Sequence, residues 1–295
     1  MTKSQITRPM LAEKVEHESQ IRFPCLVTPK LDGIRCLKVD GKAVSRKFKP
    51  IPNHYVRGLV EQLPDGVDGE LICPDSDFNT TQSLIMTEEG KPDFSYYVFD
   101  YVKHSLHLPY RHRMAELAKL DLPLFVNRLL PVRIDNLVEL LEKEKFYLGL
   151  GYEGIITRLP SGPYKCGRST LTEGYLLKFK RFEDSEATII GMIESLENTN
   201  EAKVDALGLT ERSHHNAGKV PKGTLGAFQC KDLITGIEFE IGTGVGLTKE
   251  LRQLIWDTKE NYINQVIRYK YHNVGLKDKP RFPSFQGFRN TLDMS

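Results

Sequence analysis

The segment FPCLVTPKLDGIR, residues 23–35, joins a short apolar stretch to an unusual cluster of polar residues. The apolar part predicts a β-strand, and Lys30, Asp32 and Arg35 follow it directly. A lysine acts as a nucleophile only when it is deprotonated, and nearby cations and desolvation favour that state by lowering its pKa. Gly33 allows the close approach of backbone or substrate. Because short motifs often arise by chance, the segment alone is equally consistent with a surface hairpin that carries an ordinary Lys–Asp pair.

Strand and helix signals are mixed along the chain on both sides of this segment, and no internal repeat is present. Asp40-Gly41 predicts a tight hairpin turn, and the aromatic run FSYYVFDYV predicts a buried strand. Strands are expected at 24–28, 36–39, 42–45, 68–73, 94–102, 154–158 and 175–179, and amphipathic helices at 54–63, 111–120 and 135–148, the last with Asp135 as its N-cap.

After about residue 181 the pattern changes to short β-prone segments separated by turns. These segments lie at 187–193, 224–231, 236–241 and 265–272, with one helix expected at 248–258. Such spacing is typical of a small barrel, and the OB-fold is the leading candidate. The polar stretch 197–222 is too long for a tight turn, so it is either functional or disordered, and we expect disorder in the absence of a partner.

Composition excludes several classes of protein. The chain has 295 residues with 41 Lys+Arg against 39 Asp+Glu, so its net charge of +2 excludes a strongly basic nucleic-acid coat protein and an acidic tail. Its five cysteines are widely spread and form no metal-binding or disulfide pattern. The N-terminus has no signal-peptide pattern and no apolar run is long enough to span a bilayer. We therefore expect an intracellular protein in a reducing compartment, with no membrane partner.

Further motifs follow the lysine segment in a fixed order along the chain. They are SRKFKP at 45–50, DGE at 68–70, FSYYVFDYV at 94–102, YEGII at 152–156 and LLKFKR at 176–181. This series resembles the covalent nucleotidyltransferase superfamily, which contains ATP-dependent DNA ligases, RNA ligases and mRNA capping enzymes. YKCGRSTLTEG at 164–174, GTGVG at 242–246 and PRFPSFQGFR at 280–289 extend the likeness to ATP-dependent DNA ligases of the minimal chlorella-virus type, over residues 23–289.

The resemblance implies an α+β fold with two domains. Residues 1–184 would form the nucleotidyltransferase, or adenylation, domain, which is ATP-grasp-like with antiparallel sheets and flanking helices. Residues 185–295 would form an OB-fold domain with a DNA-clasping loop near 197–222. No separate DNA-binding domain is implied, and the expected partner is nicked duplex DNA, encircled by a monomer.

The resemblance also implies a role for each motif residue. Lys30 would attack the α-phosphate of ATP and become lysyl-AMP. Phe99 would stack on adenine, although the residues alone favour core packing, and Glu70 would hold the ribose hydroxyls rather than act as a solvated hairpin carboxylate. Glu153 would bind Mg²⁺ or Mn²⁺, because a hard cation takes few carboxylates and several waters.

Other residues would contact phosphates or DNA. Lys178 and Lys180 alternate along one expected strand, so they would share a face and neutralise the α-phosphate in the transition state. Asp32, Arg35, Arg46 and Arg168 would contact the nick, with Arg46 on the 5′-phosphate because a guanidinium binds phosphate bidentately. Arg35 and Arg168 are also expected at the nucleotide, and Arg212 and Lys219 in the DNA-clasping loop. Arg281 and Arg289 lie in the C-terminal motif, and one of the two would act on the β- and γ-phosphates of ATP.

Three alternatives to a nick-sealing ligase remain open from the sequence. An mRNA capping guanylyltransferase shares the Lys30 motif and the OB domain. However, the segments YKCGRST and PRFPSFQGFR resemble those of DNA ligases rather than those of capping enzymes. An RNA ligase is disfavoured by the ligase-type C-terminal motif, and a non-catalytic OB-type DNA-binding module is disfavoured because the lysine and glutamate motif residues are all present.

The near-neutral net charge hides local basic clusters. Residues 30–49 contain seven Lys/Arg against two Asp, residues 158–181 contain six against one Glu, and residues 268–289 contain six against one Asp. These segments carry the motifs, so the positive charge lies where phosphates are expected to bind.

Overall fold

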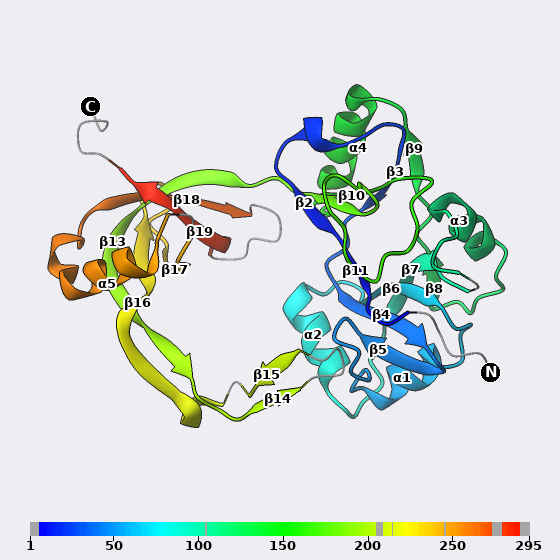
Figure 1. The fold of residues 1–295 in the computed structure, drawn as a ribbon, viewed down its shortest axis with the longest axis horizontal. Helices are drawn as coiled ribbons and strands as arrows, with labels where there is room; N and C mark the ends of the chain where they lie inside the picture. The colour runs from blue at the N-terminus through cyan, green and yellow to red at the C-terminus, as the bar shows by residue number, and fades with distance from the viewer. Residues whose placement is uncertain are drawn as a thin grey trace. The chain divides into compact units, whose positions relative to one another are not determined.

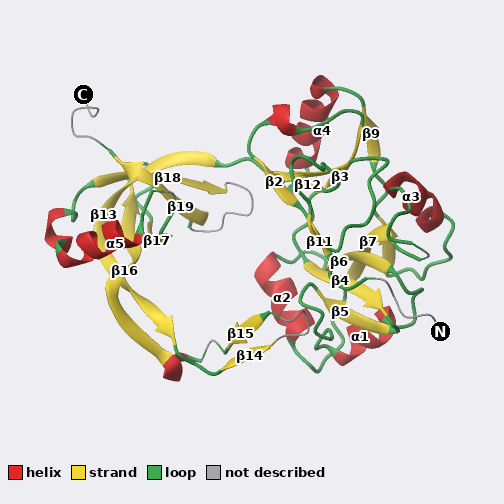
Figure 2. Ribbon diagram, viewed as in Figure 1, coloured by secondary structure: helices red, strands yellow, loops and turns green. Residues whose placement is uncertain are grey.

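The computed structural model describes residues 6–103, 105–204, 209–213, 215–244, 246–272 and 279–289. The chain forms two compact units (Figure 1). The first holds the described residues up to Lys180 together with Leu209, and the second holds the other described residues from Arg181 onward. The expected α+β class is confirmed, because the first unit combines two largely antiparallel sheets with helices and the second contains a closed barrel (Figure 2). Among the described residues, no helix is long and apolar enough to cross a membrane.

The first sheet of the N-terminal unit is built on the predicted hairpin. Its order is β5-β4-β6-β7-β8, and each pair is antiparallel except β7 with β8. Asp40 and Gly41 have φ values of 49° and 78°, the left-handed conformation that a tight two-residue hairpin requires. The strands are β4 (Ile34–Val39), β5 (Lys42–Ser45), β6 (Val67–Ile72), β7 (Ser95–Tyr101) and β8 (Val126–Arg128).

The second sheet brings distant segments side by side. Its order is β2-β12-β10-β3-β9, so the strand before Lys30 lies beside the strand after Glu153. The strands are β2 (Glu13–Val15), β3 (Cys25–Pro29), β9 (Val132–Ile134), β10 (Ile155–Arg158) and β12 (Leu177–Phe179). A short parallel pair, β1 (Met10–Leu11) with β11 (Gly167–Arg168), completes the unit.

Helices cover both sheets. α1 (His54–Val60), α2 (Phe78–Met86) and α3 (Tyr110–Ala118) pack on the first sheet through one apolar cluster, and α4 (Leu137–Gly149) packs on the second. The expected N-cap of α4 at Asp135 is wrong. Asn136 caps the helix by accepting a hydrogen bond from the Glu139 backbone, whereas the Asp135 carboxylate is engaged by Arg133.

The C-terminal unit is a five-stranded barrel with the order β13-β16-β17-β19-β18. Its strands are β13 (Glu183–Asn198), β16 (Lys219–Asp232), β17 (Glu238–Gly242), β18 (Val266–His272) and β19 (Arg281–Phe288), and α5 (Lys249–Asp257) lies between β17 and β18 in the chain. This is the OB-type barrel that the strand spacing predicted. Apolar residues from all five strands and α5 fill its interior.

The expectation of disorder in 197–222 is wrong for the described part of this stretch. β13 and β16 continue as a ribbon to the pair Asn198 and Lys219, and β14 (Ala202–Val204) pairs with β15 (Thr210–Arg212). The side chain of Asn200 donates to the carbonyls of Ser213 and His215, at 2.8 and 2.9 Å. Backbone and amide hydrogen bonds therefore stabilise a polar segment that buries little apolar surface. His214, in the same stretch, lies outside the described residues.

The five cysteines are free thiols. Cys25, Cys36, Cys73 and Cys230 are buried, whereas Cys166 is half-buried. Burial raises the pKa of Cys25 and of Cys230 to about 12, so neither thiol ionises near neutral pH.

One carboxylate joins three neighbouring strands of the barrel. Asp232 on β16 is 4 % exposed and accepts hydrogen bonds from the hydroxyls of Tyr269 on β18 and Ser185 on β13, at 2.7 and 3.0 Å. It also accepts from the backbone of Ile234 and Thr235 in the turn that follows β16. Burial acts against the charged form, but these donors hold the pKa of Asp232 below its usual value.

We expect Asp232→Ala to lower the free energy of unfolding of the C-terminal unit by about 3 kcal/mol, because it leaves several donors without an acceptor. Chemical denaturation measures the loss. Asp257→Ala, at an exposed position in α5, is the matched control and should change stability by less than about 0.5 kcal/mol. Equal effects of the two substitutions would contradict the role of Asp232.

Candidate active site

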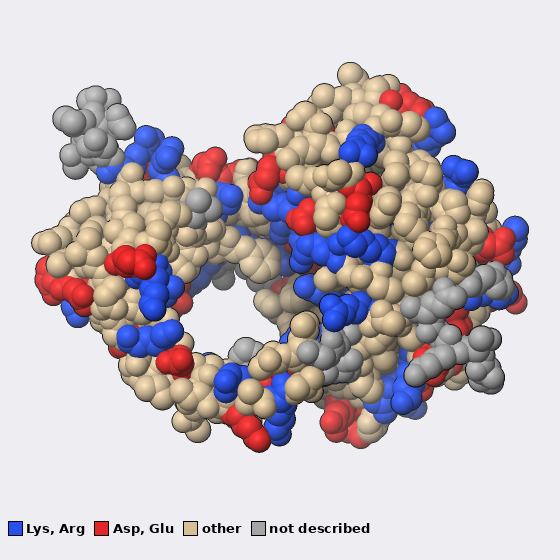
Figure 3. Space-filling view, in the orientation of Figure 1, with Lys and Arg blue, Asp and Glu red and all other residues tan. Residues whose placement is uncertain are grey.

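A pocket of about 240 Å³ lies in the N-terminal unit and is lined by strands of both sheets. The predicted residues in its lining are Lys30, Arg35, Arg46, Glu70, Phe99, Arg168 and Lys178. Figure 3 shows Lys and Arg side chains gathered over the region of β2 and β11 in this unit. The pocket is therefore strongly cationic, as a site for phosphates requires.

Lys30 is held at the end of β3 by contacts with the residues that precede β10. Its backbone N–H donates to the carbonyl of Gly154 at 2.9 Å, and its ammonium forms an ion pair with Glu153, whose side chain is 5 % exposed. Gly154 has a φ of +150°, and a Cβ there would lie 2.4 Å from the carbonyl oxygen of Phe179. Glycine is therefore required for β10 and β12 to meet and for Glu153 to reach Lys30.

Phe99 presents its ring to the pocket instead of lying fully in the core. The guanidinium carbons of Arg35 and Arg158 lie 4.7 and 5.7 Å from the ring centroid. Tyr110 supports the strand from behind, because its hydroxyl donates to the Phe99 carbonyl at 3.1 Å. An aromatic face at this position can stack on a flat heterocycle.

Glu70 lies on β6 at the pocket wall. Burial raises its pKa to about 7, although the nearby charges of Arg35 and Lys30 act in the opposite direction. The backbone N–H of Gly33 also favours the charged form. Glu70 can therefore accept hydrogen bonds fully only at or above neutral pH.

Lys178 on β12 lies on the cationic side of the pocket. Burial and the positive charges of Arg168, Lys30 and Arg46 lower its pKa. This mutual repulsion is relieved when an anion binds, so the group favours a phosphate ligand.

Three predicted residues of the N-terminal unit do not line the pocket, namely Asp32, Glu153 and Lys180. Lys180 follows the last residue of β12, so the expected strand alternation with Lys178 does not continue to it. Asp32 lies in the turn between β3 and β4 and does not line the pocket either.

Four predicted residues belong to the C-terminal unit. Arg212 on β15 donates to the carbonyl of Asn200, and Lys219 is the first residue of β16. Arg281 begins β19, where its guanidinium lies 5.1 Å from the ring centroid of Phe282. Arg289 follows β19 and forms an ion pair with Glu186.

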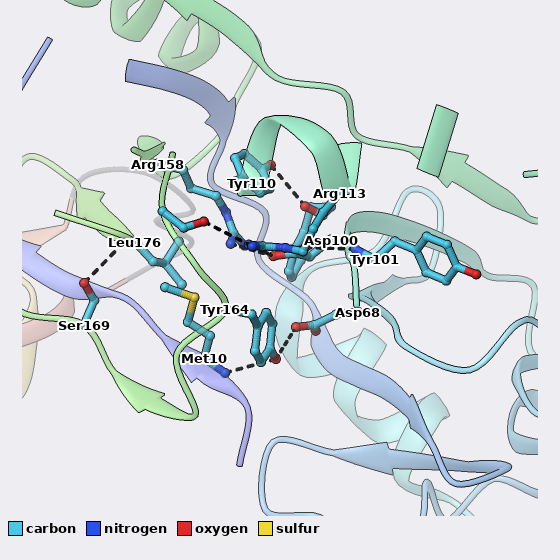
Figure 4. Close-up of polar contacts among 12 residues, drawn as sticks. Met10, Asp68, Asp100, Tyr101, Tyr110, Arg113, Arg158, Tyr164, Ser169 and Leu176 are labelled. Carbon is cyan, nitrogen blue, oxygen red and sulfur yellow. Dashed lines mark hydrogen bonds and ion pairs between the residues drawn. The ribbon is translucent and has the colours of Figure 1, made fainter. Parts of the chain in front are cut away.

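The sequence motifs do not mark the buried charges behind the pocket. Asp100 pairs with Arg113 at 2.7 Å and with Arg158 at 2.8 Å, and all three are at most 4 % exposed (Figure 4). Burial acts against the charged carboxylate, but the two arginines lower the pKa of Asp100. Arg158 lines the pocket and is the last residue of β10. Its position at the end of the strand predicted after the Glu153 motif is the one sequence signal that could have pointed to it.

A second buried contact holds the predicted Arg35. Its Nη2 donates to Asp68 at 2.6 Å, and the hydroxyl of Tyr164 donates to the same carboxylate at 2.7 Å. The Tyr164 hydroxyl also accepts from the backbone of Met10 at 3.1 Å (Figure 4). Arg35 is thus an element of the pocket wall that an internal carboxylate keeps in place.

The chain is similar to known DNA ligases along nearly its whole length. Residues 217–289 match the family model of the DNA ligase OB-like domain. A curated DNA ligase of Haemophilus influenzae is 25% identical over 272 residues, which cover 88% of this chain and 85% of that protein.

Solved structures support the same relationship. A Lig E DNA ligase is 22% identical, covers 96% of this chain and 99% of its own, and shares the fold with a TM-score of 0.72. The crystal structure of the chlorella virus DNA ligase-adenylate is 36% identical, with a TM-score of 0.57, and covers 96% of this chain and 100% of its own. On this identity the chain belongs to the DNA ligase family, in its minimal ATP-dependent form.

Proposed function

We propose that this DNA ligase transfers AMP from ATP to Lys30 and then seals 5′-phosphate/3′-hydroxyl nicks in duplex DNA. The observation that carries the proposal is that Lys30 shares one cationic pocket with the ring of Phe99 and the carboxylate of Glu70. We assign adenylation to the N-terminal unit and DNA contacts of the clasping type to the C-terminal unit.

ATP would lie across the pocket with its base on Phe99 and its ribose hydroxyls at Glu70. Its α-phosphate would then lie near Lys30 and Lys178, where positive charge is greatest. One of the two arginines of the C-terminal motif, Arg281 or Arg289, would act on the β- and γ-phosphates during adenylation.

The first step joins Lys30 to the nucleotide. The amine nitrogen attacks the α-phosphorus, a P–N bond forms, and the bond to the pyrophosphate oxygen breaks. Glu153 accepts a hydrogen bond from the Lys30 ammonium, so it lies where the proton departs. Lys178 stabilises the charge that develops on the α-phosphate oxygens.

A divalent cation, Mg²⁺ or Mn²⁺, fits this donor set. Among the described residues no group of three or more His, Cys, Asp or Glu could enclose a metal. A cation held by one or two carboxylates, water and substrate phosphates is the usual arrangement for Mg²⁺, and Glu153 would hold it here. Bound in this way, the cation would neutralise phosphate charge.

The remaining steps seal the strand. Arg46 would bind the 5′-phosphate of the nick, whose oxygen attacks the phosphorus of lysyl-AMP and releases Lys30. The 3′-hydroxyl then attacks the activated 5′-phosphate, the phosphodiester bond forms, and AMP leaves. Each step exchanges one ligand on phosphorus, so the protein contributes mainly positioning and charge stabilisation.

We also propose that the enzyme acts as a monomer that encircles the duplex. Arg212 and Lys219 lie on the ribbon and hairpin formed by β13 to β16, and their positive charges suit the phosphate backbone.

We expect Lys30→Ala to abolish the AMP adduct formed with labelled ATP and a divalent cation, because no nucleophile remains. The variant should still seal a nick that is supplied already adenylylated, because the later steps do not use the amine. Lys42→Ala, at the exposed start of β5, should retain the adduct. Labelling of the wild type by GTP in place of ATP would favour a capping enzyme and contradict the proposal.

We expect Glu70→Gln to stabilise the fold at pH 8 and to weaken ATP binding. A carboxyl whose pKa rises from 4.5 to about 7 on folding destabilises the folded state as the pH rises through that interval. The variant should therefore be more stable than the wild type by roughly 1–2 kcal/mol at pH 8, and equally stable below pH 4.5.

Thermal unfolding against pH, with a parallel titration of ATP, measures both effects. Glu142→Gln, at an exposed position in α4, should change neither. A stability difference that is independent of pH would show that ionisation of Glu70 is not its cause.

A further inference from the structure

The turn that carries Arg46 contains a residue in an unfavourable backbone conformation. β5 ends at Ser45, whose backbone N–H donates to the carbonyl of Lys49 at 2.8 Å and whose carbonyl accepts from the N–H of Phe48 at 2.8 Å. Phe48 has a φ of +56°. This arrangement is a three-residue hairpin loop in which the last loop residue is left-handed.

Phenylalanine is an unusual choice at this position. A side chain with a Cβ lowers the population of the left-handed conformation about tenfold relative to glycine, and Gly or Asn normally occupies the site. The ring of Phe48 is half-buried and packs against the apolar cluster that contains Leu37, Val44 and Val102. The packing of the ring is what offsets the strain of the backbone.

The ring links the tip of the turn to the core of the unit. Backbone contacts hold the two strands at the base, through the bridge between Val44 and Pro50 and the hydrogen bond from Ile51 to Ala43 at 3.0 Å. Phe48 adds an apolar contact nearer the tip, two residues from the guanidinium that lines the pocket.

We propose that Phe48 is a positioning residue for nick sealing: it fixes the turn so that Arg46 stays directed into the pocket. Arg46 is an exposed side chain, and a small displacement of a group that binds phosphate is costly. Asn would form the same turn with less strain, so folding alone does not explain Phe48, and a role at the pocket that Arg46 lines does. The inference rests on the proposed contact of Arg46 with the 5′-phosphate.

Two substitutions distinguish the effect of the left-handed turn from the effect of the apolar contact made by the Phe48 ring. Phe48→Asn keeps the left-handed turn and removes the ring, whereas Phe48→Leu keeps an apolar side chain and the strain. The readout is the affinity of the lysyl-AMP enzyme, in EDTA, for nicks with a 5′-phosphate compared with nicks with a 5′-hydroxyl. Loading the enzyme with AMP beforehand removes any effect on the ATP step.

We expect Arg46→Ala to abolish the preference for the 5′-phosphate, and Phe48→Asn to lower it about tenfold. Phe48→Leu should stay within about twofold of the wild type, and Phe48→Asn added to Arg46→Ala should change nothing further. A general loss of structure would instead weaken binding to both nicks and add to the effect of Arg46→Ala.

The outcomes distinguish this inference from the proposed function. Full preference in Phe48→Asn, with loss in Arg46→Ala, would overturn the positioning role and leave the Arg46 contact intact. Full preference in Arg46→Ala would overturn the Arg46 contact, and the inference with it. Equal losses in Phe48→Asn and Phe48→Leu would also overturn anchoring by apolar packing.

Discussion

The pocket depends on one buried carboxylate, Asp100, which forms ion pairs with two arginines. Asp100 belongs to β7 in the first sheet, Arg113 to α3, and Arg158 to β10 in the second sheet. Burying these charges costs free energy that good geometry offsets, and loss of one partner would leave an uncompensated charge. The pairs therefore act mainly as a constraint: the Arg158 pair joins the two sheets of the N-terminal unit, and the Arg113 pair fixes α3 on the first sheet.

The chemistry of the pocket follows from this constraint. Cations from both sheets are held close together. Burial, and after it the positive charges of Arg168, Lys30 and Arg46, lower the pKa of Lys178. Glu70 shows the opposite effect, because burial raises its pKa to about 7 despite its cationic neighbours. The charged forms of both side chains are less stable in the pocket than in water. A nucleotide with hydroxyls at Glu70 and phosphate at Lys178 would stabilise both charged forms. The residues that would bind the nucleotide therefore lower the stability of the folded protein.

Local sequence signals predicted the regular elements well. β5 was predicted at 42–45, where the structure has it, because a turn and an alternating strand mark it clearly. The short strands β1, β2, β8, β9 and β11 were missed, because two or three residues carry no clear alternation. α2 was missed because Thr81 and Ile85 are its only buried residues among those described, and β19 because Pro283 and a register shift interrupt it. The length of β13 and β16 was underestimated, because pairing with a distant partner stabilises their polar ends.

The candidate site was predictable only where a motif marked it. Motif residues such as Lys30, Phe99 and Lys178 do line one pocket, but Arg158 and Asp100 depend on contacts across the fold that no local pattern records. Lys180 shows the limit of strand alternation, which fails where a strand ends.

The distribution of the thiols makes one cysteine selectively accessible to chemical labelling. Four cysteines are buried, and Cys166, two residues before Arg168 of the pocket, is half-buried. A thiol reacts through its thiolate, and burial suppresses ionisation in the interior. An alkylating fluorophore would therefore attach preferentially at Cys166 in the folded protein, without prior mutagenesis.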